Sequence, residues 1–319
     1  MKNCCKKNKN GYYGPMKIGI LSFKALSVRP SPEELRLQKV AREMGHTARI
    51  FRSARCQLVY DGTSKRLLYE GKLFPKYDVM ITRPGVIRDV SLSVAMVKEM
   101  EIMGMPVFNK YSSIIDAKNK LKTTQILSNY NIPVPKTVVI RYQEYLSKAV
   151  DLVGGMPVIV KTPYGSYGNG VQIVESMRGL KSTLDWKTNV MYMIQEFVKY
   201  TKGQDIRIFV VGGKIMGSMM RKASKGEFRS NIELGGVGRP VEITEEEHDI
   251  ALRSVQALDL DYGGVDIIRS KNGPCVLEVN SNPGFKELER STGIDIAGSI
   301  IEYAIQYAEK TPVFGKNGS

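Results

Sequence analysis

The stretch from Gly264 to Asn280 is GVDIIRSKNGPCVLEVN. Gly264–Arg269 and Cys275–Asn280 each have the length and apolar content of a β-strand. The residues between them, Ser270–Pro274, combine Ser, Asn, Gly and Pro, which is typical of a turn. The stretch therefore predicts a β-hairpin.

Three oxygen-bearing side chains lie on this hairpin. Because side chains alternate along a strand, Glu278 and Asn280 share one face, and the hairpin can bring Asp266 opposite them. Such groups are costly to bury unless they bind a cation, and oxygen ligands without His or Cys suit Mg²⁺. A carboxylate that is hydrogen-bonded to the backbone of a turn is the alternative.

A small-residue loop precedes this hairpin in the chain. The strand-like run that starts at Val158 ends in Lys161, and Gly165, Gly168 and Gly170 follow before the next strand. Glycines let the backbone approach an anion closely, so successive N–H groups can cradle a phosphate. The loop has neither the Walker pattern nor a G-x-G-x-x-G fingerprint. A flexible hairpin without a ligand remains an alternative interpretation.

A third segment, 205–231, places charges among apolar strands. The polar residues of this segment are Asp205, Arg207, Arg221, Lys222, Arg229 and Asn231. Arg221 and Lys222 follow the apolar run Ile215–Met220. Cations at such positions either line an anionic site or belong to a solvated sheet face.

The first half of the chain alternates strands and helices. Lys17–Phe23 is a strand-length apolar run, and Ser31-Pro32-Glu33-Glu34 has the residues of a helix start with a capping box. Asp61-Gly62 predicts a hairpin turn between Leu58–Tyr60 and Lys65–Tyr69. This alternation predicts an open α/β layer over residues 16–112.

The second half has a different pattern. Ile114–Tyr130 predicts one amphipathic helix. Beyond it, strand-like runs follow one another through tight Gly-rich turns such as Gly212-Gly213, which favours antiparallel sheets in an α+β arrangement. A last helix is predicted from Ile294 to Glu309.

Composition narrows the function classes. The chain has 319 residues, enough for about two domains. Lys and Arg (47) exceed Asp and Glu (32), and the net charge of +15 favours an acidic partner such as a nucleotide, a nucleic acid or an acidic substrate. His46 and His248 are far apart in sequence, and no C-x-x-C pair occurs, which disfavours zinc sites, Ser-His-Asp chemistry and a thioredoxin motif.

The ends of the chain and its location can also be predicted. Residues 1–15 are polar and basic, which predicts a disordered tail, and residues 313–319 are expected to be a flexible C-terminus. No apolar run reaches the length of a membrane-spanning helix, about 18 residues. A cytoplasmic protein with reduced thiols is expected.

With these residues placed, the chain resembles the ATP-grasp superfamily, and closely the RimK-type glutamate ligases, over residues 16–310. Five blocks carry the resemblance: Gly203-Gln204-Asp205-Ile206-Arg207, Phe228-Arg229-Ser230-Asn231, Gly264-Val265-Asp266-Ile267, Leu277–Gly284 and Thr292–Gly298. It implies an ATP-grasp fold with an N-terminal α/β pre-ATP-grasp domain (16–112). A central α+β lobe (113–194) and a C-terminal α+β lobe (195–312) would clamp ATP.

The resemblance implies roles for particular residues. The phosphates of ATP would be bound by Lys120 and Lys161, and the adenine by the hinge residues Gln195, Glu196, Phe197 and Val198. Asp205 would lie near the ribose. The other nucleotide contacts would come from the loop glycines Gly165, Gly168 and Gly170 and from the stretch Arg229, Ser230 and Asn231. The magnesium ligands would be Asp266, Glu278 and Asn280. Arg221 would be the catalytic cation that faces the transferred phosphate, and Arg83 and Lys222 would contact substrate.

The implied reaction is ATP-dependent amide formation. The carboxylate of an acidic acceptor, a protein C-terminus or a small cofactor, takes the γ-phosphate, and L-glutamate then displaces phosphate. The implied cofactors are ATP and two Mg²⁺ ions, for which Mn²⁺ can substitute. A homo-oligomer, tetramer or dimer, is expected, with no membrane partner and no specific nucleic acid.

Two departures from the family pattern concern the substrate more than the use of ATP. Asn119 stands where Asp is frequent, and Phe197 where Tyr is frequent. The alternatives are a ligase of the same fold that uses another amino acid or a carrier-protein acceptor, and a basic nucleotide- or nucleic-acid-binding regulator without catalysis. ATP turnover that depends on an acidic acceptor would distinguish the expected ligase from these alternatives.

Overall fold

The computed structural model describes residues 14–85, 93–163, 170–184, 190–199, 203–224 and 237–311. The chain divides into two compact units. Unit 1 comprises Met1–Ile114, Gly284–Lys286 and Asp295–Ser319, and unit 2 comprises Ile115–Pro283 and Glu287–Ile294. Each unit has its own sheets and its own buried apolar side chains.

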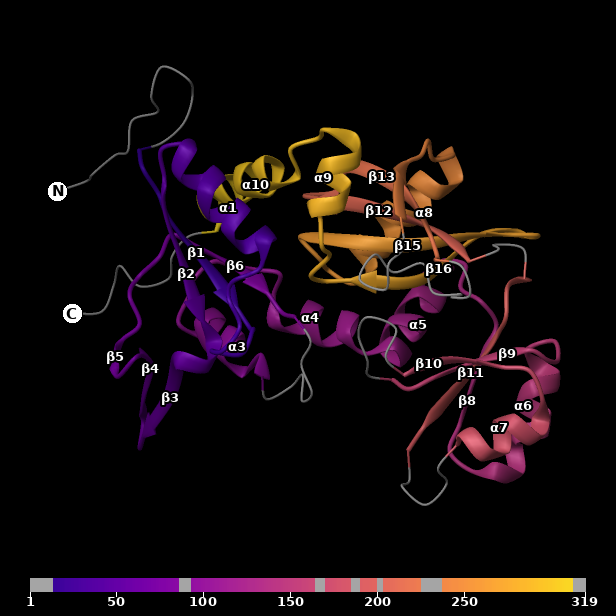
Figure 1. Ribbon diagram of the computed structural model, residues 1–319. Helices are drawn as coiled ribbons and strands as arrows, with labels where there is room; N and C mark the ends of the chain where they lie inside the picture. The colour runs from indigo at the N-terminus through magenta and orange to yellow at the C-terminus, as the bar shows by residue number, and fades with distance from the viewer. Residues whose placement is uncertain are drawn as a thin grey trace. The chain divides into compact units, whose positions relative to one another are not determined.

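A parallel sheet with the strand order β2-β1-β6-β7 forms the centre of unit 1. Its strands and the accompanying helices are β1 (Lys17–Ser22), β2 (Thr47–Arg52), β6 (Val79–Arg83), β7 (Val107–Phe108), α1 (Pro32–Glu43), α3 (Ala95–Ile102) and α10 (Ile296–Lys310). Helices α1 and α10 lie side by side and pack on the sheet (Figure 1). β6 is buried along its whole length, as expected for a strand covered on both faces. The predicted open α/β sheet is confirmed.

Helix α1 begins where the sequence predicts. Ser31 Oγ accepts a hydrogen bond from the backbone N–H of Glu34, and the Glu34 carboxylate accepts one from the backbone N–H of Ser31, at 2.7 Å. This reciprocal capping box satisfies two donors that the first turn of a helix otherwise leaves without partners.

A small antiparallel sheet, β3-β4-β5, also belongs to unit 1. It consists of β3 (Cys56–Asp61), β4 (Ser64–Tyr69) and β5 (Lys72–Leu73), and the 3₁₀ turn η1 (Ser53–Arg55) precedes it. The predicted turn at Asp61-Gly62 is confirmed, and Gly62 has a φ of 58°, which glycine adopts without strain.

Unit 2 contains a four-stranded antiparallel sheet with the order β10-β9-β11-β8. Its elements are β8 (Thr137–Ile140), β9 (Val158–Lys161), β10 (Val171–Val174), β11 (Tyr192–Glu196), η2 (Gln143–Tyr145), α6 (Leu146–Leu152) and α7 (Met177–Thr183). The two helices pack on one face of the sheet through apolar side chains such as Leu146, Leu180 and Ile194.

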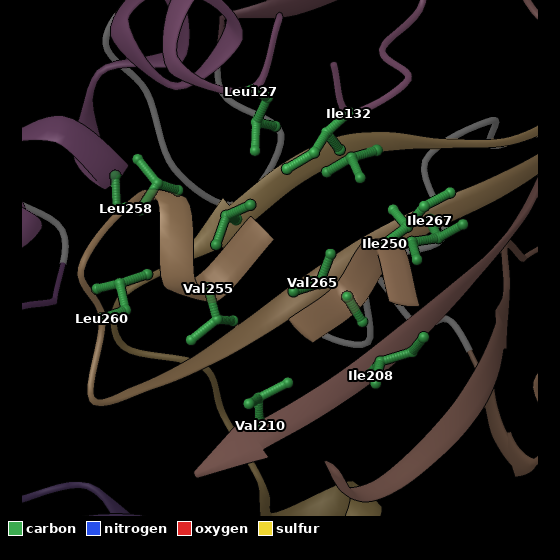
Figure 2. Close-up of a cluster of buried hydrophobic side chains, with 14 of the residues drawn as sticks. Leu127, Ile132, Ile208, Val210, Ile250, Val255, Leu258, Leu260, Val265 and Ile267 are labelled. Atoms are coloured by element: carbon green, nitrogen blue, oxygen red, sulfur yellow. The ribbon is translucent and has the colours of Figure 1, made fainter. Parts of the chain in front are cut away.

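Unit 2 also contains a five-stranded antiparallel sheet with the order β14-β13-β12-β15-β16. Its elements and the accompanying helices are β12 (Gln204–Val211), β13 (Lys214–Lys222), β14 (Val237–Pro240), β15 (Tyr262–Ser270), β16 (Gly273–Asn280), α8 (Glu245–Ala257) and α9 (Lys286–Thr292). Figure 2 shows how Ile208 and Val265 of the strands gather with Ile250 and Val255 of α8 in one buried cluster. The predicted α+β half is confirmed.

The prediction of a single helix over Ile114–Tyr130 is wrong. The structure has two helices, α4 (Tyr111–Lys118) and α5 (Lys120–Asn129), separated by Asn119. Asn119 is extended, and its side-chain oxygen accepts hydrogen bonds from the backbone N–H groups of Leu121 and Lys122 at 3.0 and 3.1 Å. It therefore starts a new helix as an N-cap residue.

Elements α6, α8, α9 and β14 were not predicted from the sequence. For α8 the signal was present, because Thr244 and Glu247 form a second capping box. Over the described residues, no helix combines the length and the apolar composition needed to span a bilayer.

Candidate active site

The β15–β16 hairpin places the predicted oxygen ligands together. Asp266 and Glu278 lie directly opposite each other across the two strands, and Asn280 follows two positions along β16. The amide nitrogen of Asn280 donates to Asp266 Oδ2 at 3.3 Å. A register shift just after Asp266 interrupts the regular pairing at this point. The juxtaposition predicted from the strand period is confirmed.

Two arginines from neighbouring strands hold the Asp266 carboxylate. Arg207 lies opposite Asp266 on β12 and donates from Nε to Oδ1 and from Nη2 to Oδ2, both at 2.7 Å. Arg221 of β13 also reaches Oδ2 through its Nη2, at 2.9 Å.

Arg221 is at the same time bound to Asp205. Its Nε donates to Oδ1 at 2.7 Å and its Nη2 to Oδ2 at 2.6 Å, and the two residues are cross-strand partners on β13 and β12. The side chains of Arg221, Asp205 and Asp266 are only 2%, 8% and 5% exposed. We call Asp205, Arg207, Arg221 and Asp266 the charge ladder.

The charge ladder keeps Asp266 and Arg221 ionised despite their burial. Burial by itself raises the pKa of Asp266, but the positive charges and hydrogen bonds of Arg207 and Arg221 outweigh it and hold that pKa below its ordinary value. Burial likewise opposes the charged form of Arg221, but the carboxylates of Asp266 and Asp205 raise its pKa further above its ordinary value. Each buried charge therefore depends on its partners.

The donor set at the hairpin fits a hard divalent cation. A carboxylate has about four lone-pair sites, and in this arrangement Oδ2 of Asp266 receives three donors whereas Oδ1 receives one. Oδ1 therefore retains acceptor capacity, and Glu278 and Asn280 on the neighbouring strand are half-buried. Within the described part of the chain, no three His, Cys, Asp or Glu side chains are placed to hold a metal. The predicted set differs because it combines two carboxylates with an amide.

Lys161 faces the same cluster from the other sheet of unit 2. It ends β9 and is 8% exposed. Burial lowers its pKa to about 8; the carboxylate of Glu278 opposes this shift, and the charge of Lys120 adds to it. The structure thus brings Lys161, Lys120 and Glu278 within electrostatic reach of one another.

Lys120 is the first residue of α5. Its backbone N–H donates to the carbonyl oxygen of Pro163 at 2.8 Å, which ties the start of the helix to the segment after β9. The N-terminus of a helix carries a partial positive charge, so a cation in this position is disfavoured unless an anion is close. Lys161 adds a second cation there, and the pair is suited to bind a phosphate.

The predicted hinge residues lie at the end of β11. Glu196 forms two hydrogen bonds with Lys136: its N–H donates to the Lys136 carbonyl, and its carboxylate accepts from the Lys136 N–H, both at 2.9 Å. Gln195 donates through Nε2 to Thr137 Oγ1 at 2.8 Å. Phe197 and Val198 follow and are half-buried.

Cys275 lies near both of these groups. It is buried, and burial followed by the charge of Glu196 raises the pKa of its thiol to about 12, while the charge of Lys161 opposes that shift. Glu196 and Lys161 therefore both lie within electrostatic reach of Cys275 on β16. A thiol with so high a pKa is a packing residue and a poor nucleophile.

Other predicted site residues are separate from this cluster or lie outside the described residues. Gly165, Gly168, Arg229, Ser230 and Asn231 belong to the latter group. Gly170 has a φ of 79°, and its carbonyl accepts from Thr162 N–H. Lys222 is exposed at the end of β13.

Arg83 ends β6 in unit 1. It is 4% exposed, and its guanidinium carbon lies 5.5 Å from the centre of the Phe285 ring, a cation–π distance.

Arg207 belongs to the charged segment that the sequence singles out, but its contact with Asp266 was not predicted. The sequence signal is the Asp-x-Arg spacing in Asp205-Ile206-Arg207, which puts both charges on one face of a strand. Its partner Asp266 is distant in sequence, and only the pairing of β12 with β15 brings the two together.

Comparisons with known proteins cover nearly the whole chain. A RimK PreATP-grasp domain model matches residues 16–114, and a RimK-like ATP-grasp domain model matches residues 117–304. A probable alpha-L-glutamate ligase of Maridesulfovibrio salexigens is 35% identical over 94% of this chain and 100% of its own length. Another, from Coxiella burnetii, is 36% identical over 94% and 99%.

Solved structures agree with this fold. The ATP-grasp ligase PsnB, complexed with a minimal precursor, superposes with a TM-score of 0.70 at 18% identity over 92% of this chain and 99% of its own. A RimK domain protein of Sphaerobacter thermophilus gives 0.69 at 19% identity over 90% and 99%. D-alanine–D-alanine ligase of Bacillus anthracis with ATP gives 0.64 at 18% identity over 92% and 98%. At these identities the structures show the fold alone.

Proposed function

The chain belongs to the RimK-like ATP-grasp family and is an ATP-grasp ligase, and we propose that it joins L-glutamate to the carboxylate of an acidic acceptor. The acceptor is a protein C-terminus or a small acidic cofactor. ATP is converted to ADP and phosphate, and the product is an amide.

The proposed reaction has two steps. An oxygen of the acceptor carboxylate forms a bond to the γ-phosphorus of ATP as the bond to the β-phosphate oxygen breaks, which gives an acyl phosphate and ADP. The amine of glutamate then forms a bond to the acyl carbon as the carbon–oxygen bond to phosphate breaks, and the amine proton passes to solvent.

All the reacting groups of the first step are anions, so the main task of the site is to overcome their repulsion. Lys161 and Lys120 are the proposed partners of the phosphates, and Arg221 stabilises charge on the transferred group. The N–H and carbonyl groups of the segment from Gln195 to Val198 are the proposed contacts of the adenine. These groups position and neutralise the substrates, and no protein nucleophile is required.

The remaining roles follow the same proposal. Asp266, Glu278 and Asn280 would hold Mg²⁺, which supplies charge neutralisation at the phosphates; two ions are proposed, with Mn²⁺ able to substitute. Asp205 would lie near the ribose. The other proposed contacts are with nucleotide (Gly165, Gly168, Gly170, Arg229, Ser230, Asn231) and with substrate (Arg83, Lys222).

The observation that carries this proposal is that Glu278 lies opposite Asp266 and within electrostatic reach of the buried Lys161. Carboxylates from a hairpin of one sheet and a buried lysine from the other converge in unit 2. That combination suits a phosphate–metal complex, because a phosphate between the lysine and the metal ion neutralises both positive charges. The solved PsnB complex that contains Mg and ADP is consistent with this use of the fold.

The direct test is a mass-spectrometric assay with ATP, Mg²⁺, isotope-labelled amino acids and candidate acceptors, including a ribosomal protein and acidic cofactors. Stepwise mass gains of one glutamyl unit with equimolar ADP are expected. A preference for a neutral or basic amino acid would overturn glutamate as the substrate. ADP formation without an amide on any acceptor would overturn the ligase assignment.

A further inference from the structure

The hydrogen bonds of the Asp266 carboxylate are distributed unevenly over its two oxygens. Oδ2 accepts from the amide of Asn280 at 3.3 Å and from the Nη2 groups of Arg207 and Arg221 at 2.7 and 2.9 Å. Oδ1 accepts from Nε of Arg207 at 2.7 Å, and among the described residues this is its one donor. A carboxylate oxygen has about two lone pairs, so the acceptor capacity that Asp266 retains lies on Oδ1.

Arg207 is the partner that binds both oxygens of this carboxylate. Its Nε and Nη2 are held at a fixed separation by the planar guanidinium, and that separation matches the two oxygens of a carboxylate. Arg221 and Asn280 each reach Oδ2 alone. A contact at one oxygen leaves the carboxylate able to turn about it, whereas the Arg207 fork fixes the plane of the Asp266 carboxylate.

Arg207 is itself held in place by its neighbours in the sheet. It lies between Asp266 on β15 and the buried Met219 on β13, and its side chain is 12% exposed. A Cβ at Gly264 would lie 3.7 Å from Cδ of Arg207 and 2.7 Å from Cβ of Pro283. The missing side chain at Gly264 thus leaves the space in which the other two side chains lie, and the fork is confined to one direction.

A second fork in the same sheet has a structural use that this one lacks. Arg269 of β15 binds Glu247 through Nε and Nη2 at 2.6 and 2.9 Å, and Glu247 also closes the capping box of α8. The carboxylate of Asp266 ends no helix, and over the described residues it accepts from side chains only. Because buried ion pairs add little net stability, the Arg207 fork needs another explanation.

We propose that Arg207 is a positioning residue for the divalent cation: its fork turns the Asp266 carboxylate so that Oδ1 is presented to the ion. This inference rests on the proposed function in taking Asp266 as a metal ligand, and it adds Arg207 to the residues that determine metal affinity. Arg207 acts through Asp266, in the way that partners of metal-binding carboxylates orient them.

The charge of Arg207 works in the opposite direction from its fork. A cation beside Asp266 repels a divalent ion, so loss of the charge alone would strengthen metal binding. Loss of the fork alone would weaken it, because the carboxylate could then turn away from the ion. The two effects differ in sign, so a measurement of metal affinity distinguishes them.

The test measures the affinity of the ADP complex for Mn²⁺, read from the electron paramagnetic resonance signal of free Mn²⁺, and it needs no turnover. Arg207→Lys keeps the charge but replaces the fork by a single ammonium group, and Arg207→Gln removes both. Each variant is expected to weaken Mn²⁺ binding about tenfold. Arg207→Lys should bind ADP without metal as tightly as the wild type, because the charge at this position is unchanged.

The matched control is Arg269→Gln. It removes a fork of the same geometry from a buried carboxylate of the same sheet, so it should lower the melting temperature and leave the Mn²⁺ affinity at its wild-type value. Thermal melting checks that every variant folds. Arg207→Lys leaves Asp266 with a cationic partner, so the test remains available if Arg207→Gln does not fold.

Three results would overturn the role of Arg207. They are a wild-type Mn²⁺ affinity in Arg207→Lys, tighter Mn²⁺ binding by Arg207→Gln, and a loss of affinity in Arg269→Gln equal to that in the Arg207 variants. The same data separate this inference from the proposed function. If the wild-type ADP complex takes up no Mn²⁺, the metal set itself is wrong; if all variants bind Mn²⁺ like the wild type, only the role of Arg207 is refuted.

Discussion

Around Asp205 and Arg207, the two faces of the sheet β14-β13-β12-β15-β16 are both largely buried but hold opposite kinds of side chain. One face presents Ile206, Ile208 and Val265, which pack with α8 in the cluster of Figure 2. The other presents Asp205 and Arg207 at alternate positions of the same strand. Strand period alone separates the two faces, so a single β-strand contributes both to the core and to the site.

The difference shows that burial serves different ends on the two faces. Aliphatic burial stabilises the fold by about 25 cal/mol per Å² of apolar area removed from water. Buried ion pairs add little net stability, because desolvation offsets their attraction, yet losing one partner is strongly destabilising. Stability alone therefore does not account for the charge ladder, and variants on the two faces should have different effects.

The largest expected effect is on turnover. Glu278→Gln should lower kcat by on the order of 10²–10³, because it removes a charge from the proposed metal set while keeping the shape of the side chain. ADP release measures the rate, and circular dichroism checks the fold. Glu302→Gln, at an exposed position of α10, is the matched control and should be fully active. Normal turnover of Glu278→Gln at saturating ATP and limiting Mg²⁺ would show that the assignment is wrong.

The next effect is on stability. Arg221→Met should lower the free energy of unfolding by about 3–5 kcal/mol, because it leaves the buried Asp205 carboxylate without its two hydrogen bonds. Urea denaturation measures the change. Arg290, which pairs with Glu287 through the same two nitrogens but at the surface, is the control: Arg290→Met should hardly move the midpoint. Equal shifts in the two variants would contradict the account of the charge ladder.

The lowered pKa of Lys161 predicts that the affinity for ADP changes by about tenfold per pH unit above that pKa. Because burial lowers its pKa to about 8, the charged form is lost as the pH rises through 8, and the affinity for ADP should fall above that pH. The unfolded state holds this proton up to higher pH, so the contribution of Lys161 to stability rises over the same range. Lys161→Arg stays charged and should give a flat binding profile. A wild-type profile that is flat from pH 7 to about pH 9.5 would refute the role of Lys161.

The smallest effect belongs to the apolar face. Ile208→Val should lower the free energy of unfolding by about 0.5–1.5 kcal/mol and leave the KM for ATP unchanged. Denaturation and steady-state kinetics are measured on the same preparation. A large change in KM without a change in stability would contradict the assignment of this face to the core.

Much of the fold could be predicted because its signals are local. The capping box at Ser31 and Glu34, the turn at Asp61-Gly62 and the β15–β16 hairpin each depend on a few adjacent residues. The break at Asn119 was missed because the apolar pattern runs through it, and only the side-chain bonds to the next helix reveal the cap.

The site was likewise predictable only where its residues are brought together by local sequence signals. Asp266 and Glu278 face each other because the hairpin turn sets their register. The contact of Arg207 with Asp266 was missed because it depends on the pairing of β12 with β15, which local sequence does not encode. For the same reason the approach of Lys161 to Glu278, between strands of two different sheets, emerges only from the folded chain.

The most direct test of the central claim, that the charged face of this sheet binds a metal–nucleotide complex, is calorimetric titration with ADP in the presence and absence of Mg²⁺. We expect Mg²⁺ to strengthen ADP binding to the wild-type protein and to Glu302→Gln but not to Glu278→Gln. An equal Mg²⁺ effect in all three proteins, or no ADP binding by the wild type, would contradict it.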